Sequence, residues 1–443
     1  MFHRQGKKAK PMFAKPLKDL IAVMTPAQLL ATSKRQELLE KIKDSSSFDT
    51  HRFDSIAMIL INNLVNHCQN LPETTNSYYA SLGGLLDHAL NRTEAALHLF
   101  RDYIIQTGTD DLSEEQQLWL YVLLSAAVLQ GIGKLQIDYH VELFDMNGQV
   151  LKQWNPVLES MTSMGSYYQY NFEKGHDDDL RRRLNLLLAR LLMPASGFSW
   201  IAANTQALTV WLALLNEDWQ SAGTLGALLV RADAMAIQRY FNEFMLKHLA
   251  RNGRLNRITT FVDTAPESLL DKERLMGVEF IHWLTNAMEK GEIMINKAPL
   301  LMVPGGLLMS VEMYRMFMQE HPEYKNWQAV QNGLLSLELH SVGADGNPIS
   351  RFEQTGTQQM HSGVVLSEFA VALPDEMKIH NMHTGKVSTI SAVELIHTAQ
   401  FNSNFTSKQH AANPTSLTHL NASGHWQKLE ESLHLQKGNI TGG

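Results

Sequence analysis

The N-terminal half of the sequence contains the stretch Leu123-Leu124-Ser125-Ala126-Ala127-Val128-Leu129-Gln130-Gly131-Ile132-Gly133-Lys134. Its first part is an apolar run that ends in small residues, which predicts a buried helix. Its second part places Gly131 and Gly133 close together, which is typical of a helix terminus or of a point where another group approaches the backbone. The stretch therefore predicts a core helix that ends at a turn or at a site of close approach.

Length and composition limit the class of protein. A chain of 443 residues with 44% hydrophobic and 8% aromatic residues is typical of a globular protein. Two or three domains are expected, because a single core rarely grows to this size. The formal net charge of −7 argues against a wholly basic nucleic-acid-binding protein, although it is compatible with a local basic face.

The cysteine count and the distribution of apolar residues bear on the compartment. Cys68 is the only cysteine, which excludes an internal disulfide and fits a reducing cytoplasm. No segment reaches the ~18–20 apolar residues of a membrane span, so we expect a cytoplasmic protein without membrane insertion. Residues 1–24 are expected to be a basic flexible terminus, either a solvated arm or one that touches phosphate. Six cations precede its first acid, Asp19: Arg4, Lys7, Lys8, Lys10, Lys15 and Lys18.

Residues 25–252 predict one helical domain. Thr25 is a candidate N-cap, and Pro26 occupies the first helical position. Apolar residues then recur at helical spacing, for example over 180–192 and 225–249. One exception is the alternating pattern on both sides of Met146-Asn147-Gly148, which predicts a β-hairpin.

A smaller α+β domain is expected over residues 271–375, after a linker at 253–270. Its predicted helices are followed by a polar turn at 344–348 and an alternating segment, which is the order of a winged-helix module. Residues 376–443 become rich in polar residues beyond about Asn402 and are expected to be a mostly disordered tail. The predicted fold class is therefore mainly α.

Several motifs in the right order resemble the TraI-like relaxases of the MobH class. The resemblance covers about Leu29 to Leu373 and implies an HD-type helical domain that cuts DNA at a transfer origin. It also implies a winged-helix-like domain that contacts DNA. The motifs are Leu71-Pro72-Glu73, Gly83-Gly84-Leu85-Leu86-Asp87-His88, Gly131-Ile132-Gly133-Lys134, Trp154-Asn155-Pro156, Val303-Pro304-Gly305, Tyr314, Trp327-Gln328-Ala329-Val330-Gln331 and Leu337-Glu338-Leu339-His340.

The departures from this family are concentrated at its metal ligands. The family carries histidines just before Gly-Gly, where this chain has Tyr78-Tyr79-Ala80-Ser81, and His-Asp where this chain has Gln130-Gly131. His88 matches a remaining signature histidine. His176 and Asp233 are counterparts of the later ligands, in a loose assignment. Lys134 matches the lysine of the HD segment, and we consider that it could meet an anionic ligand.

These departures make the family's metal chemistry improbable. A water-activating divalent metal needs several histidine nitrogens and carboxylate oxygens, whereas Gly131 has no side chain and Gln130 is a neutral, poor ligand. We therefore expect no cofactor; a divalent metal, if bound, would use His88, His176 and Asp233. The alternative for His88 alone is a packed, hydrogen-bonded core residue.

Three functions remain open at this stage. The first is a catalytically degenerate relaxase-like protein of conjugation, type IV secretion or mobile-element DNA handling, which binds DNA or a partner protein. The second is a phosphodiesterase or DNA nuclease with altered metal ligands, and the third is an accessory or secreted scaffold without DNA contact. The predicted helix 326–337 has few cations, so its module is at least as suited to protein binding or packing as to DNA. The sequence leaves the oligomeric state open, including a homo-oligomer.

Overall fold

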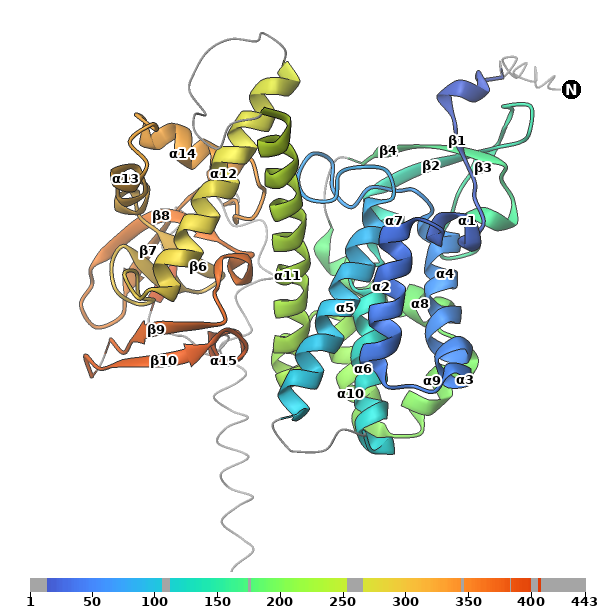
Figure 1. Cartoon of the computed structure of the whole chain (residues 1–443), viewed down its shortest axis with the longest axis horizontal. Coiled ribbons are helices and arrows are strands. Elements are labelled where there is room, and N and C mark those ends of the chain that lie inside the picture. The colour runs from blue at the N-terminus through green and yellow to red at the C-terminus, as the bar shows by residue number, and fades with distance from the viewer. Residues whose placement is uncertain are drawn as a thin grey trace, which may run out of the picture.

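The computed structural model describes residues 14–105, 112–173, 177–252, 266–343, 346–382, 384–399 and 405–407. A mainly helical N-terminal unit is followed by a smaller α+β unit (Figure 1). The predicted fold class is confirmed.

The N-terminal unit is built around α6 (Glu114–Leu129). Its residues from Leu120 to Leu129 are all buried, because the helix is apolar on every side and other helices surround it. Ser113 and Gln116 close its start with a capping box. The other helices of this unit are α1 (Pro26–Leu30), α2 (Ser33–Ser46), α3 (Thr50–Arg52), α4 (Ile59–Cys68), α5 (Gly84–Ile105), α7 (Lys134–Ile137), α8 (Asp178–Leu192), α9 (Ala195–Ala202), α10 (Thr205–Leu215) and α11 (Trp219–Asn252).

The expectation that no segment is long and apolar enough to cross a membrane is wrong on length and composition, because the described residues contain one such continuous helical stretch, Glu114–Ile137. A second candidate arises only if α8 and α9, which meet at a bend of 118°, are counted as one span. Since 78% of the apolar window in the first stretch is buried, it serves here as the core helix of the unit.

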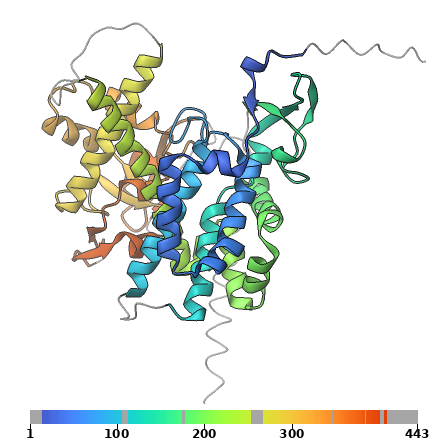
Figure 2. The same cartoon turned by 45° about the vertical axis from the view of Figure 1, so that its right-hand side comes forward.

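A four-stranded antiparallel sheet lies at the far end of the helical unit from the C-terminal unit (Figure 2). Its strands, in the order β1-β4-β2-β3, are β1 (Ile21–Ala22), β2 (Tyr139–Phe144), β3 (Val150–Gln153) and β4 (Tyr167–Phe172). The pairing of β2 with β3 confirms the predicted hairpin. The prediction that residues 1–24 are flexible is wrong for residues 14–24. Ile21 pairs with Tyr168 of β4, and the backbone of this segment completes the sheet edge; residues 1–13 lie outside the described part.

Helix α11 belongs to both units. Its backbone breaks at Gly223 (φ 59°), and beyond this point it packs on α5 on one side and on α15 (Ala392–Ala399) on the other (Figure 1). Ala232 lies in the core of the helical unit, whereas Ile237 and Phe241 lie in the core of the C-terminal unit. This shared helix places residues of the two units next to each other.

The C-terminal unit consists of helices packed on a five-stranded antiparallel sheet, in the order β11-β7-β8-β6-β5. Its helix α12 begins at Pro266, inside the predicted linker, and crosses α14 so closely that a Cβ on Gly277 would lie 2.2 Å from the Gly333 oxygen. The first elements of this unit, in chain order, are α12 (Pro266–Glu289), β5 (Leu300–Val303), β6 (Gly306–Met309), α13 (Val311–Glu320), α14 (Trp327–Leu335), β7 (Ile349–Gln354), β8 (Met360–Leu366) and the 3-10 helix η4 (Phe369–Ala372).

The expected tail from residue 376 begins too early. Four further elements follow η4: β9 (Glu376–His380), β10 (Val387–Ser391), α15 (Ala392–Ala399) and β11 (Phe405–Ser407). Met377, Leu395 and Ile396 are buried, so this segment completes the core of the unit. The elements are too short to show a clear apolar period in the sequence. Residues 408–443 of the expected tail lie outside the described part.

Candidate functional site

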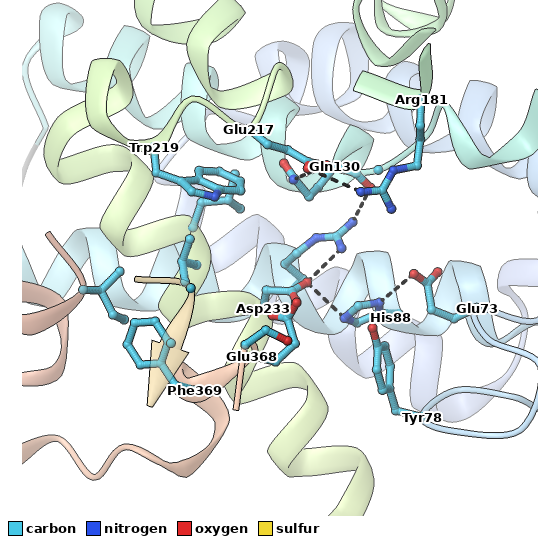
Figure 3. A pocket seen from close by; sticks show the side chains of 18 of the residues that line it. Glu73, Tyr78, His88, Gln130, Arg181, Glu217, Trp219, Asp233, Glu368 and Phe369 are labelled. Carbon is cyan, nitrogen blue, oxygen red and sulfur yellow. Dashed lines mark hydrogen bonds and ion pairs between the residues drawn. The ribbon is translucent and has the colours of Figure 1, made fainter. Parts of the chain in front are cut away.

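A pocket of about 440 Å³ lies where the two units meet (Figure 3). We call the wall from the helical unit the floor and the wall from the C-terminal unit the roof. The floor is rich in charged side chains, whereas the roof is mainly apolar. The floor consists of Glu73, Tyr78, His88, Arg92, Gln130, Gly131, Lys134, Arg181, Glu217, Trp219, Leu229, Val230 and Asp233. The roof consists of Met302, Val303, Gly305, Gly306, Ser367, Glu368, Phe369 and Ile396.

His88, in the first turns of α5, lies between two carboxylates. Its Nδ1 is 3.4 Å from Oε1 of Glu73, and its Nε2 is 3.1 Å from Oδ1 of Asp233. The ring is only 2% exposed, and neither nitrogen makes a contact with hydrogen-bond geometry. Burial lowers the pKa of His88, but Asp233 and Glu73 raise it more, so the pKa lies above its ordinary value. The two acids therefore favour the charged form of the ring.

Arg92 lies one helical turn after His88 and joins three elements. Its guanidinium donates to Asp233 (2.9 Å) on α11 and to the carbonyl oxygens of Ala127 (2.9 Å) and Gln130 (3.1 Å) at the end of α6. It thereby closes the C-terminal end of α6, where a cation is favoured, and neutralises the acid. Burial raises the pKa of Asp233, but His88 and Arg92 lower it more, to about 2.

Lys134 is the matching cation on the other side of His88. Its Nζ contacts the Glu73 carboxylate and also donates to the Glu73 carbonyl oxygen at 3.2 Å. Burial raises the pKa of Glu73, but Lys134 and then His88 lower it more, so this pKa lies well below its usual range. Each acid beside His88 thus has its own fixed cation.

Tyr78 and Tyr79 hold the ring of His88 in place. Tyr79 is stacked on it at 4.9 Å between ring centroids, and Tyr78 meets it edge-on at 5.5 Å. The loop that carries these tyrosines folds back so tightly that a Cβ on Gly84 would lie 1.8 Å from the backbone carbonyl oxygen of Tyr79. Glycine is therefore required at position 84, and the tyrosines occupy the place where the resembling family carries histidines.

The end of α6 carries the two positions that depart from the HD pattern. Gln130 is the C-cap residue; its Nε2 is 3.5 Å from Oε1 of Glu217, and its buried Oε1 has no hydrogen-bond partner. Gly131 has a φ of +70°, and a Cβ built there would meet nothing within 4 Å. Position 131 thus faces the pocket rather than packed atoms.

Arg181 and Glu368 complete the charged groups of the pocket. Arg181 on α8 is 3.4 Å from Oε2 of Glu217. Desolvation raises the pKa of Glu368 to about 7, and Asp233 and Glu217 add to the effect because their charges are negative. Glu368 is the only acid that the described roof contributes.

The structure brings together most of the residues that the sequence singled out. His88, Gln130, Gly131, Lys134 and Asp233 all line the pocket, whereas His176 lies outside the described residues. The acids after His176 behave as expected for a helix start: Asp177 accepts from Leu180 N at 2.9 Å, and Asp179 pairs with Arg183 at 2.7 Å.

Three important groups were not predicted. Arg92 had a signal, because it lies four residues after His88 and therefore on the same face of α5. Glu73 was quoted only as part of a motif. No signal in the sequence pointed to Glu368, because this residue is contributed by the other unit.

The donor set does not fit the divalent metal that the HD resemblance implies. Within the described part of the chain, no group of three or more His, Cys, Asp or Glu residues could hold a metal ion. The two carboxylates beside His88 are already paired with Arg92 and Lys134, and positions 130 and 131 supply neither an imidazole nor a carboxylate. A metal ion held by these two carboxylates would be repelled by Arg92 and Lys134.

The helical unit and the α+β unit that meet at this pocket correspond closely to the ranges of two family models. Residues 21–259 match TraI_2 ("Putative helicase"), and residues 275–386 match TraI_2_C ("Putative conjugal transfer nickase/helicase TraI C-term"). Because the first match covers more than half of the chain, the chain belongs to the TraI_2 family. No curated protein matches the chain.

Proposed function

We propose that this chain is a catalytically degenerate member of the TraI-like family that serves conjugal DNA transfer by binding rather than by cutting. The family supplies the general role in conjugal transfer. The observation that carries the degenerate assignment is the pairing of Arg92 with Asp233 and of Lys134 with Glu73 on either side of His88. In this arrangement protein cations neutralise the acids that a metal would otherwise need.

The C-terminal unit supports a binding role. The order α12, β5–β6, α13, α14, β7–β8, with β6 beside β8 and β8 beside β7, supports the proposal of a winged-helix-like module. In this module α14 would be the recognition helix, yet its exposed residues include Gln328 and Asn332 and no cation. A contact through α14 would therefore suit a protein partner of the transfer apparatus better than the DNA backbone, because phosphate contacts need cations.

A metal and nuclease measurement tests the degenerate assignment. We expect the purified full chain to bind no stoichiometric manganese, nickel or zinc and to leave transfer-origin DNA uncut with each of these metals. Stoichiometric metal together with cleavage that His88→Ala abolishes would establish the alternative, a phosphodiesterase with altered ligands.

The double variant Gln130→His, Gly131→Asp is the matched control. A Cβ at position 131 meets nothing within 4 Å, although its φ of +70° disfavours any side chain, and the variant restores both ligand types. Metal binding by the variant alone would locate the loss at these two positions.

A DNA-retardation measurement tests the binding role. Direct phosphate contact predicts a shift at low salt that weakens steeply as salt rises. No shift at low salt would favour the protein partner, and failure to bind any transfer protein as well would leave the scaffold alternative.

A further inference from the structure

The pocket has two dissimilar halves (Figure 3). One half holds the ion pairs around His88, and the other is lined by Trp219, Phe369 and neighbouring aliphatic side chains. A ligand that fills the pocket would therefore need a polar end and an apolar body.

The positive groups of the pocket are already engaged. Arg92 bonds Asp233 and two carbonyl oxygens, and Lys134 bonds Glu73. Arg181 lies within ion-pair distance of Glu217 (3.4 Å) and Asp178 (3.6 Å). A ligand anion would have to break one of these pairs.

Two acceptors of the pocket remain free in the described part of the chain, and one buried donor, Nε of Arg181, is also without a hydrogen-bond partner there. Among the described residues, the carboxylate of Glu368 forms no ion pair, and it faces a volume that Asp233 and Glu217 also border. The buried Oε1 of Gln130 has no hydrogen-bond partner, because Nε2 of the same amide is turned toward Glu217. A donor supplied by a ligand would satisfy this buried acceptor.

The aromatic side chains favour the same kind of guest. Trp219 and Phe369 line the pocket beside the acids, and ring faces attract ammonium and guanidinium groups. A guanidinium or ammonium group on an alkyl chain offers the donors that such acceptors need and could bury its methylenes against these rings.

We propose that the pocket between the two units binds an organic cation, an alkyl guanidinium or alkyl ammonium, with Glu368 as its counter-charge, Gln130 as a further acceptor, and Trp219 and Phe369 against its apolar stem. The proposal rests on the proposed function in one respect, that no metal ion competes for the acids. The same chemistry has two sources, a free small amine and the arginine or lysine side chain of a partner protein.

Calorimetric titration of the full chain with agmatine, and separately with the peptide acetyl-Gly-Arg-Gly-amide, tests the proposal. We expect saturable binding of at least one probe, weakened about tenfold or more by Glu368→Gln, because the variant removes the charge and keeps the shape. Agmatine binding would identify a free amine as the source. Binding of the peptide alone would identify a partner's side chain.

Two further variants make the result specific. Glu376→Gln removes an exposed acid on β9, outside the pocket, and should leave binding unchanged. Phe369→Leu keeps the apolar volume but removes the ring face, and should weaken binding severalfold. The thermal unfolding of each variant shows whether it is folded.

Three outcomes would overturn the proposal: no binding of either probe at millimolar concentration, binding that Glu368→Gln does not weaken, or binding of inorganic phosphate that Glu368→Gln strengthens. A parallel manganese titration separates this failure from that of the proposed function. If neither the amine probes nor manganese binds, only the proposal of the cation site fails. If manganese binds stoichiometrically, the cation site and the proposed function both fail.

Discussion

The floor and the roof of the pocket differ in how their charges are arranged. On the floor, His88 lies between Glu73 and Asp233, and Lys134 and Arg92 pair with these acids. The roof presents apolar side chains and one acid without an ion pair among the described residues. The floor charges therefore act chiefly on one another and stabilise the fold, whereas the roof leaves a charge free to meet a ligand.

Removal of Arg92 should disrupt the ion pairs of the floor and cause the largest loss of stability among the predicted changes. Arg92→Ala leaves Asp233 without its cation and uncaps the end of α6, so we expect the free energy of unfolding to fall by about 3–5 kcal/mol in urea titration. The control is Arg183→Ala, which removes an exposed pair with Asp179 and should cost only about 0–1 kcal/mol. Equal effects of the two variants would show that the floor is no more than a surface network.

A methyl group on Gly84 should displace the loop that carries Tyr79. The new Cβ would lie 1.8 Å from the backbone carbonyl oxygen of Tyr79. Gly84→Ala should therefore lower the free energy of unfolding by about 1–3 kcal/mol through overpacking. Gly131→Ala is the comparison, because its Cβ meets open space and only the positive φ opposes it, at about 1–2 kcal/mol. If Gly131→Ala cost clearly more than Gly84→Ala, the tight loop would not be what fixes the ring of His88.

Much of the floor could be predicted from the sequence, and the reason is local. The apolar run before Gln130 predicts α6, and the glycines after it predict the turn that opens into the pocket. The family resemblance then singles out His88 and Asp233 as residues of one site. The sequence did not reveal that Arg92 bonds Asp233 or that Lys134 bonds Glu73, because such pairing depends on side-chain directions and not on spacing alone.

The roof could not be predicted, because its position depends on contacts between the units. Glu368 precedes η4, which packs on α11, a helix whose residues belong to both cores. No periodicity in the sequence reports that contact. The strands and helix beyond residue 376 were missed for a related reason: each is short, and they are stabilised by burial against distant residues rather than by an amphipathic period.

The connection between floor and roof should respond to a smaller change. Buried Ser77, in the loop between Glu73 and Tyr79, donates from Oγ to the Leu337 oxygen of the C-terminal unit at 2.5 Å. Ser77→Ala should lower the free energy of unfolding by about 1 kcal/mol, because that oxygen loses its donor. The exposed Ser163→Ala should stay within about 0.5 kcal/mol of wild type. A Ser77 variant with separate unfolding transitions would show that this bond is a principal link between the units.

Glu368 offers the smallest effect, and it appears only as a pH dependence. Its pKa is raised from 4.5 to about 7 in the folded protein, so between these values the folded state binds more protons than the unfolded chain. Wild-type stability should therefore decrease as pH rises through this window, and Glu368→Gln should not show this decrease.

The variant should match wild type near about pH 4 and be more stable near about pH 8, measured by urea unfolding at each pH. Because the side chain also contacts solvent in the pocket, screening keeps the difference small. Glu376→Gln, at an exposed acid away from the pocket, is the control. A variant less stable than wild type at the higher pH would mean that Glu368 already has a cationic partner within the chain. The roof would then be neutralised like the floor, and the difference between the two walls would disappear.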